Sequence, residues 1–267
     1  MPNVTGNGVR IHYTQTGSGP DLVFLHGLGG TGQAWLPVIA CSLSDKHRVT
    51  AYDLRGHGKS EMPASQYTSA DMARDLAGVL DALEIESADV VGHSYGGRVA
   101  LHFGVMFPER LRNLVVVDTR LSALQPMPRL REWPQWRFWR RDIERLGIDL
   151  DEDRELSLDL LFAVARRSGV FQAMRDDGRI ERWDTLMRGT TAREDFEAVA
   201  GLTRDAIATV KQRTLAVYGE LSFCLPTLHE LQKLIHMTTV VVPGIGHFIP
   251  QLKPRLVGKH LLEFLAN

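Results

Sequence analysis

The chain has 267 residues, 44% of them hydrophobic, and a formal net charge of −1 at pH 7. This size can bury a full core and suits one α/β domain that carries an insertion. The near-neutral charge and the lack of a basic tract argue against nucleic acid or an anionic membrane as a partner. The two cysteines, Cys41 and Cys224, lie in different apolar segments without metal-like spacing, so we expect reduced, buried thiols and no metal site.

Signals for targeting and membrane insertion are missing from the sequence. Residues 1–10 lack the basic-then-apolar pattern of a signal peptide. No apolar run reaches the roughly 18 residues that a membrane span needs. We therefore expect a soluble, cytoplasmic protein without a membrane partner.

The first elements of the chain alternate between strand and helix patterns. Residues 9–13 alternate apolar and polar side chains like an edge strand, and 21–25 form a continuous apolar run typical of a buried strand. That run ends at His26-Gly27-Leu28-Gly29-Gly30, whose glycines allow a tight bend with backbone N–H groups turned above the sheet, as an oxyanion site requires. A helix is predicted over 33–43, and a strand over 49–52.

The stretch 88–107 predicts a strand, a sharp turn and a helix, after a helical stripe at 71–83. The turn, Gly92-His93-Ser94-Tyr95-Gly96, fits the pattern G-x-S-x-G. In such a turn the serine takes strained backbone angles, and the glycines on either side are needed because a Cβ there would clash with the crossing helix and strand. The turn would lift the hydroxyl clear of the sheet, which makes Ser94 the candidate nucleophile.

A β-branched run at 114–117 ends in Asp118 and predicts another buried strand. The alternation up to this point predicts an α/β fold with a mostly parallel, doubly wound sheet and helices on both faces, whose ligands bind at the carboxyl ends of the strands. His26, Ser94 and Asp118 all stand at such ends. Strand patterns return at 214–218 and 239–242, before a last helix at 255–265.

Residues 122–206 lack strand patterns and have arginine as their only basic residue. Their dense charges of both signs usually mark solvated helix faces. We predict that 1–121 and 207–267 form the core domain, and that 122–206 form a helical lid, inserted after the sixth strand, that lines an apolar pocket next to Ser94. Most of the lid's aromatic residues should pack in a core of the lid itself. These aromatics are Trp133, Trp136, Phe138, Trp139, Phe162, Phe171 and Trp183.

Four ordered motifs make the chain resemble an α/β-hydrolase of the lid-bearing, single-domain kind. They are His26-Gly27 followed by glycines, the segment 53–60 (Asp-Leu-Arg-Gly-His-Gly-Lys-Ser), the turn at 92–96, and Pro243-Gly244-Ile245-Gly246-His247 before the last helix. The resemblance covers nearly the whole sequence and is weakest in the lid. It implies a serine activated by an imidazole, an acid that orients the imidazole, and N–H donors for an oxyanion.

The resemblance assigns the base to His247, which alone among ten histidines sits on a loop after the last strand. In this family the residues at the positions of His57 and His93 are usually structural, and the one at His26 supports the oxyanion loop. The implied oxyanion donors are the backbone N–H groups of Leu28 and Tyr95. No cofactor is expected, because neither a complete dinucleotide fingerprint nor a P-loop is found.

The orienting acid departs from the family's common pattern. Many relatives end the strand before the last with Gly-(Asp/Glu)-x-Asp, whereas this chain reads Gly219-Glu220-Leu221-Ser222. A serine can accept a hydrogen bond but cannot stabilise an imidazolium by charge. We favour Asp118 as the acid, since some members take it from that strand end, although an aspartate there can merely cap the turn. Glu220, or a dyad without an acid, are the alternatives.

The nucleophile narrows the reaction that the resemblance implies. Haloalkane dehalogenases and epoxide hydrolases of this fold use an aspartate at the turn, so Ser94 argues against both. Carbon–carbon hydrolases of ring-cleavage products typically carry Asn before the serine and Trp after the histidine, where this chain has His93 and Phe248. We expect hydrolysis of a carboxylic ester or thioester of a small to medium apolar acyl substrate through an acyl-enzyme.

Two other readings stay open. One is carbon–carbon bond hydrolysis on the same fold. The other is a ligand-binding receptor or regulatory protein with little turnover, which the serine at position 222 motivates. The sequence leaves the acyl and leaving groups and the oligomeric state undetermined.

Overall fold

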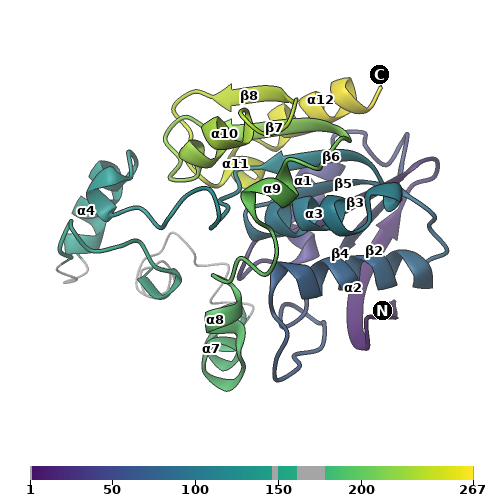
Figure 1. Cartoon of the computed structure of the whole chain (residues 1–267), viewed down its shortest axis with the longest axis horizontal. Helices are drawn as coiled ribbons and strands as arrows, with labels where there is room; N and C mark the ends of the chain where they lie inside the picture. Colours follow the sequence, from purple (N-terminus) through teal and green to yellow (C-terminus); the bar gives the residue numbers. More distant parts are fainter. Residues whose placement is uncertain (1, 146–149, 161–177, 267) are drawn as a thin grey trace.

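The computed structural model of the chain describes residues 2–145, 150–160 and 178–266. Its centre is an eight-stranded sheet with the strand order β1-β2-β4-β3-β5-β6-β7-β8 (Figure 1). All pairings from β4 to β8 are parallel, and β1 and β2 add two antiparallel pairings at one edge. This is the mostly parallel, doubly wound sheet that the sequence predicts.

The strands match the predicted runs, with one addition at the N-terminus. They are β1 (Asn3–Gly6), β2 (Val9–Thr16), β3 (Asp21–Leu25), β4 (Arg48–Tyr52), β5 (Ala88–His93), β6 (Leu111–Val117), β7 (Arg213–Gly219) and β8 (Thr238–Val242). The prediction of β2 as an edge strand is wrong, because β1 pairs with its outer side. The four residues of β1 are mostly small or polar, so they carry no strand pattern.

Helices cover both faces of the sheet. The described α-helices are α1 (Leu36–Ile39), α2 (Ser69–Ala82), α3 (Tyr95–Met106), α4 (Trp136–Arg145), α7 (Arg179–Gly189), α8 (Ala192–Asp195), α9 (Arg204–Ile207), α10 (Leu225–Leu231), α11 (Ile249–Leu252) and α12 (Pro254–Leu265). Short 3₁₀-helices are η1 (Gly32–Trp35), η2 (Pro108–Arg110) and η3 (Leu130–Glu132). The single helix predicted over 33–43 is instead η1 followed by α1, because Pro37 lacks an N–H and fits only the first turn of a new helix.

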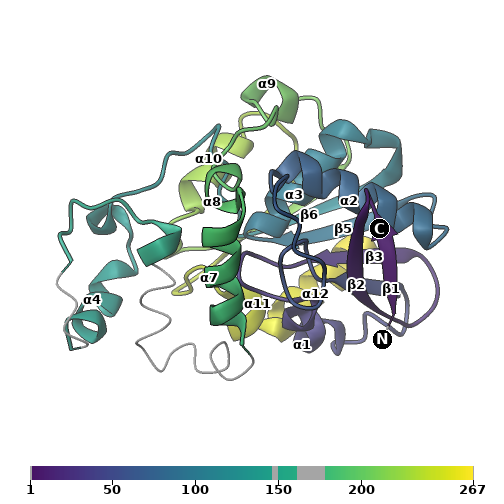
Figure 2. The ribbon, with the colours of Figure 1, turned by 90° about the horizontal axis from the view of Figure 1, so that it is seen from below.

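The side chains of successive residues in the buried strands pack into two separate apolar layers, one on each face of the sheet. In β3, Val23 and Leu25 pack with α2 and α3 on one face, while Leu22 and Phe24 pack with α1 and α12 on the other. Figures 1 and 2 show these helices on opposite sides of the sheet. Because both faces are covered, the strands read as continuous apolar runs.

The chain leaves the sheet after β6 and returns at β7. The described residues of 122–206 contain helices and no strand, apart from an isolated bridge between Arg129 and Glu155. Trp133 and Trp136 pack in a small cluster of this segment with three leucines. Figure 1 shows α4 well apart from the sheet, with α7 and α8 nearer to it. Phe162 and Phe171 lie outside the described residues.

Within the described residues, no helix combines the length and the apolar character needed to cross a membrane.

Candidate active site

Ser94 occupies a strained turn between β5 and α3. Its backbone angles are φ 56° and ψ −121°, a conformation that L-residues rarely adopt. A Cβ on Gly92 would lie 2.2 Å from the carbonyl oxygen of Gly96, and a Cβ on Gly96 would lie 2.4 Å from that of Leu25. The two glycines therefore let strand and helix cross at the distance that the turn requires, as the sequence predicts.

The loop after β3 runs across this serine. A Cβ on Gly27 would lie 2.9 Å from the Cβ of Ser94, so only glycine allows this approach. Among the described residues, no acceptor takes the backbone N–H of Leu28 or of Tyr95. Tyr95 is the first residue of α3, where the helix end favours negative charge. The two predicted oxyanion donors are therefore available to an oxygen that develops negative charge at Ser94.

Hydrogen bonds link Ser94, His247 and Asp118 in one chain. His247 Nε2 lies 3.0 Å from Ser94 Oγ, and His247 Nδ1 lies 2.8 Å from Asp118 Oδ1. A proton on Nδ1 that is donated to the carboxylate leaves Nε2 free to accept from the serine hydroxyl. The structure thus brings together the three residues that the sequence analysis favoured.

The carboxylate of Asp118 is fully buried and accepts hydrogen bonds from the end of β7. Gly219 N–H donates to Oδ2 at 2.8 Å, and the Ser222 hydroxyl donates to Oδ1. Ser222 Oγ in turn accepts the N–H of Cys224 at 3.0 Å. Sequence reasoning treated Ser222 only as a missing acid, whereas its hydroxyl contacts the acid directly.

Glu220, the alternative acid, faces another direction. Its Oε2 accepts the backbone N–H of Gly244 at 2.7 Å, at the start of the loop that leads to His247. No hydrogen bond or ion pair between Glu220 and the imidazole is present in the described part of the chain. Glu220 therefore holds the loop and does not meet the base.

Three rings surround the imidazole of His247. The rings of His93 and Phe223 each lie 4.9 Å from it, centre to centre, and that of Phe248 lies 5.3 Å from it. Burial lowers the pKa of His93 to about 3, so this ring is neutral at pH 7, and its Nε2–H donates to the carbonyl oxygen of His247 at 2.9 Å. His93 thereby holds the backbone of the base and contacts its ring.

A thiol lies beside the base and the acid. Cys224 Sγ is 3.6 Å from His247 Nδ1, and burial raises the pKa of this thiol well above its usual range. Both cysteines are free, but Cys41 is only partly buried, unlike the prediction. Asp118, Cys224 and His247 each offer a ligand atom within 4.8 Å of the others. A metal ion there would have to replace the bond between Asp118 and His247 and deprotonate the thiol.

Two further histidines support the loop after β3. His26 Nε2 accepts the N–H of Leu54 at 2.9 Å, so its Nδ1 carries the proton and donates to Gly27 at 2.7 Å. His57 Nδ1 lies 2.9 Å from the carbonyl oxygen of Arg55. Burial lowers the pKa of His26 to about 4 and that of His57 to about 3, so both rings are neutral and act as scaffold.

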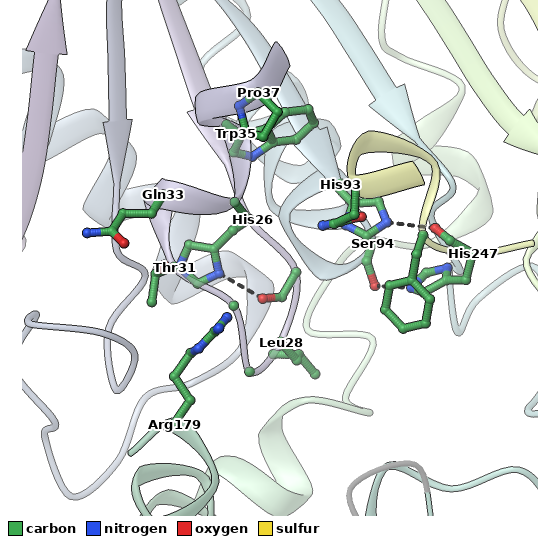
Figure 3. Close-up of a pocket in the computed structure, with 16 residues that line it drawn as sticks. His26, Leu28, Thr31, Gln33, Trp35, Pro37, His93, Ser94, Arg179 and His247 are labelled. Atoms are coloured by element: carbon green, nitrogen blue, oxygen red, sulfur yellow. Dashed lines mark hydrogen bonds between the residues drawn. The ribbon is translucent and has the colours of Figure 1, made fainter. Parts of the chain in front are cut away.

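A cavity of about 460 Å³ opens beside Ser94 (Figure 3). Its described lining is His26, Gly27, Leu28, Gly29, Gly30, Thr31, Gln33, Ala34, Trp35, Pro37, His93, Ser94, Arg179, His247, Phe248 and Gln251. Of these residues only Arg179 comes from 122–206, so the expected apolar lining from that segment is not found there. Trp183 instead stacks on Phe196, at 5.9 Å and 13°, and Trp133 packs against Phe223. Sequence reasoning did not single out Arg179, one of many arginines in its segment.

Comparisons with known proteins agree with this architecture. A family model described as the alpha/beta hydrolase fold matches residues 20–254. An epoxide hydrolase of Caballeronia sordidicola is 38% identical over 112 residues, which are 41% of this chain and 34% of that protein. A 2-hydroxymuconate semialdehyde hydrolase of Pseudomonas sp. strain CF600 is 42% identical over 115 residues, which are 42% of this chain and 41% of that protein. The match thus spans less than half the length of these relatives.

The crystal structure of an enol-lactonase from Burkholderia xenovorans LB400 superimposes with a TM-score of 0.72 and 22% identity, covering 100% of both chains.

Proposed function

The chain belongs to the α/β-hydrolase family, and from this premise we propose that it is a serine hydrolase of carboxylic esters or thioesters with a small to medium acyl group. One observation carries the proposal. His247 lies 3.0 Å from Ser94 Oγ on one side and 2.8 Å from Asp118 on the other. This arrangement suits a hydroxyl that is activated by a base, with the base held in one tautomer.

The reaction would proceed through an acyl-enzyme. Ser94 Oγ attacks the carbonyl carbon while His247 Nε2 takes its proton, and the buried charge of Asp118 stabilises the imidazolium. The backbone N–H groups of Leu28 and Tyr95 bind the oxyanion, a contribution of about 3 kcal/mol per donor in measured cases. His247 then returns the proton to the leaving group, and water hydrolyses the ester on Ser94 by the same route.

Residues 122–206 would act as a lid over the core domain formed by 1–121 and 207–267. The segment departs directly after Asp118 and rejoins the sheet at β7. Arg179 from this segment contributes to the pocket wall beside Ser94. Both features support a role for the segment in substrate selection.

A second candidate reaction is carbon–carbon bond hydrolysis. The match to a 2-hydroxymuconate semialdehyde hydrolase, at 42% identity over 115 residues, favours it. His93 and Phe248 stand where carbon–carbon hydrolases typically carry Asn and Trp, which argues against it. Epoxide hydrolysis is less favoured, because the residue at the turn is Ser94 and those enzymes use an aspartate there. The contact of 2.8 Å between His247 and Asp118 argues against the receptor hypothesis, which the serine at position 222 motivated.

Covalent labelling tests the nucleophile. A fluorophosphonate probe should label the wild-type protein and should not label Ser94→Ala. Ser65→Ala, which alters an exposed serine, is the matched control and should label normally. Labelling that persists in Ser94→Ala would contradict the proposal.

A substrate comparison tests the reaction. We expect turnover of p-nitrophenyl esters with short and medium acyl chains, and loss of several orders of magnitude in Ser94→Ala. Turnover of 2-hydroxymuconate semialdehyde without ester turnover would favour the carbon–carbon reaction. If both activities and the labelling are absent, the result would favour a ligand-binding protein with little turnover.

A further inference from the structure

The described wall of the pocket beside Ser94 is uneven in charge. Thr31, Gln33 and Gln251 give it neutral polar groups. His26 and His93 add none at pH 7, because burial lowers their pKa values to about 4 and about 3. Arg179 therefore brings a permanently charged group to the described part of this wall. An arginine in a pocket of this kind is well suited to a carboxylate.

Arg179 occupies a defined side of the pocket. Figure 3 shows it reaching from α7 toward the loop that carries His26 and Leu28, with His247 on the far side of Ser94. Arg179 shares a second, small cavity with Gly29 and Gly30 of that loop. Burial has the largest effect on the pKa of His26 and lowers it. The hydrogen bond to Gly27 raises this pKa, and the positive charge of Arg179 lowers it. The guanidinium is therefore close enough to the loop to act on a group bound there.

The reaction geometry decides which part of a substrate would meet this arginine. His247 must protonate the leaving group, so the leaving group lies on the His247 side of Ser94. The carbonyl oxygen points to the N–H groups of Leu28 and Tyr95. The acyl chain is then left to extend away from His247, toward the side of Arg179.

We propose that Arg179 binds a carboxylate at the far end of the acyl chain, and that the substrates are esters or thioesters of dicarboxylic acids with the second carboxylate free. This inference rests on the proposed serine hydrolase function and names its substrate class. A guanidinium has five N–H donors, so it can hold a carboxylate with two of them while it keeps its other contacts. The cavity of about 460 Å³ has room for a short acyl chain between Ser94 and Arg179.

The test compares two p-nitrophenyl esters of the same acid. One is p-nitrophenyl hydrogen glutarate, with a free carboxylate, and the other is its methyl ester, which is neutral and nearly the same size. The wild-type protein should prefer the free acid by about 10- to 100-fold in kcat/KM, the range expected for a hydrogen bond to a charged group. Arg179→Gln should remove this preference, so that the ratio of kcat/KM for the two esters falls to about one.

A matched control separates the pocket from the charge of the helix. Arg188→Gln removes the same charge from the same helix at an exposed position outside the pocket lining, and it should keep the preference. Arg179→Lys should keep part of it, since an ammonium retains the charge but not the planar fork. Arg179→Glu should reverse it in favour of the p-nitrophenyl ester of 4-(trimethylammonio)butyrate.

Failure of this inference can be told from failure of the proposed function. Equal turnover of the two glutarate esters by the wild type, or an equal loss of both in Arg179→Gln, would overturn the carboxylate site and leave ester hydrolysis intact. If neither ester is turned over, calorimetry with glutarate decides. Binding to the wild type that Arg179→Gln weakens about tenfold or more supports the site. Equal binding to both proteins, or no binding to either, overturns it.

Discussion

The carboxyl ends of β6 and β7 lie side by side, yet they serve the same imidazole in different ways. The strands are paired in register up to Val117 and Val217. The next residue on β6 is Asp118, which brings a charge to His247, whereas the end of β7 brings only donors, the N–H of Gly219 and the hydroxyl of Ser222. We therefore predict that neighbouring ends of a parallel sheet can exchange the roles of acid and support without moving the base.

Burial explains why the two ends depend on each other. A carboxylate with no exposed surface is unfavourable unless its oxygens accept hydrogen bonds. His247, Gly219 and Ser222 supply three such bonds to Asp118. The end of β7 thus stabilises a charge that it does not itself carry.

Removing the charge from β6 tests the comparison most strongly. Asp118→Asn keeps the shape of the side chain but removes the negative charge and can favour the wrong tautomer of His247. Loss of around 10⁴ in kcat is the precedent for this change in another triad. Glu220→Gln is the control and should change kcat less than about threefold, because Glu220 contacts Gly244 and not the imidazole. Comparable losses in the two variants would break the comparison.

Moving the charge to β7 tests whether the strand ends are interchangeable. Ser222 and His247 share one oxygen of Asp118, so an aspartate at position 222 can reach the same nitrogen. Ser222→Asp in the Asp118→Asn protein should recover about 10- to 100-fold of the lost kcat, a coupling expected for residues in direct contact. The same substitution in the wild-type protein should lower activity, since two carboxylates would then crowd one site. Steady-state kinetics of the four proteins show a rescue only if the ends are exchangeable.

Removing the support from β7 should have a smaller effect. Ser222→Ala deletes one donor to Asp118 and should lower kcat about tenfold, while Ser222→Thr keeps the hydroxyl and should retain most activity. Without that donor a buried carboxylate oxygen has one hydrogen bond fewer, so Asp118 holds the imidazole less firmly. Steady-state kinetics check this, and an unchanged kcat in Ser222→Ala would mean that the hydroxyl does not act on the acid.

The smallest effect on kcat is expected from a change at Cys224, the thiol that follows β7 in the chain. Burial raises the pKa of Cys224, so at pH 8 this cysteine should stay protonated and resist iodoacetamide, whereas the partly exposed Cys41 reacts. Mass spectrometry of the alkylated native protein checks this, with the unfolded protein as the control. Cys224→Ser should change kcat less than about threefold. Rapid alkylation of native Cys224 would show a thiolate beside the base and would require a larger role for it.

The sequence predicted the sheet well, because its strands and turns have strong local signals. The apolar runs located six of the eight strands closely, and β2 at its start. The glycines at 92 and 96 predicted the turn at Ser94, since only a backbone without Cβ atoms allows the crossing. Asp118 was favoured as the acid because it directly follows a buried strand and because some members of the resembling family take their acid from that strand end, and the structure shows it 2.8 Å from His247.

Contacts that depend on side-chain direction were not predictable in the same way. The sequence shows an aromatic-rich segment, but not that Trp183 turns toward Phe196 and Trp133 toward Phe223. Arg179 has the same pattern as its many neighbouring arginines, and only the three-dimensional arrangement places it at the pocket. The sequence singled out Ser222 as a missing acid but not its hydrogen bond, which goes to a residue more than a hundred positions earlier.

The unusual angles of Ser94 have a consequence for the range of reactions that this fold can support. With φ at 56°, the strain is stored in the main chain, and it is the same for any L-residue with a Cβ at that position. A Cβ on Gly92 or Gly96 would meet backbone atoms and not the side chain of Ser94, so these glycines accommodate the turn whatever group that side chain carries. A thiol or a carboxylate in place of the hydroxyl would therefore be held above the sheet in the same position. Changing the attacking atom requires a change of one side chain and no new main-chain path, so a single inherited turn can host successive chemistries.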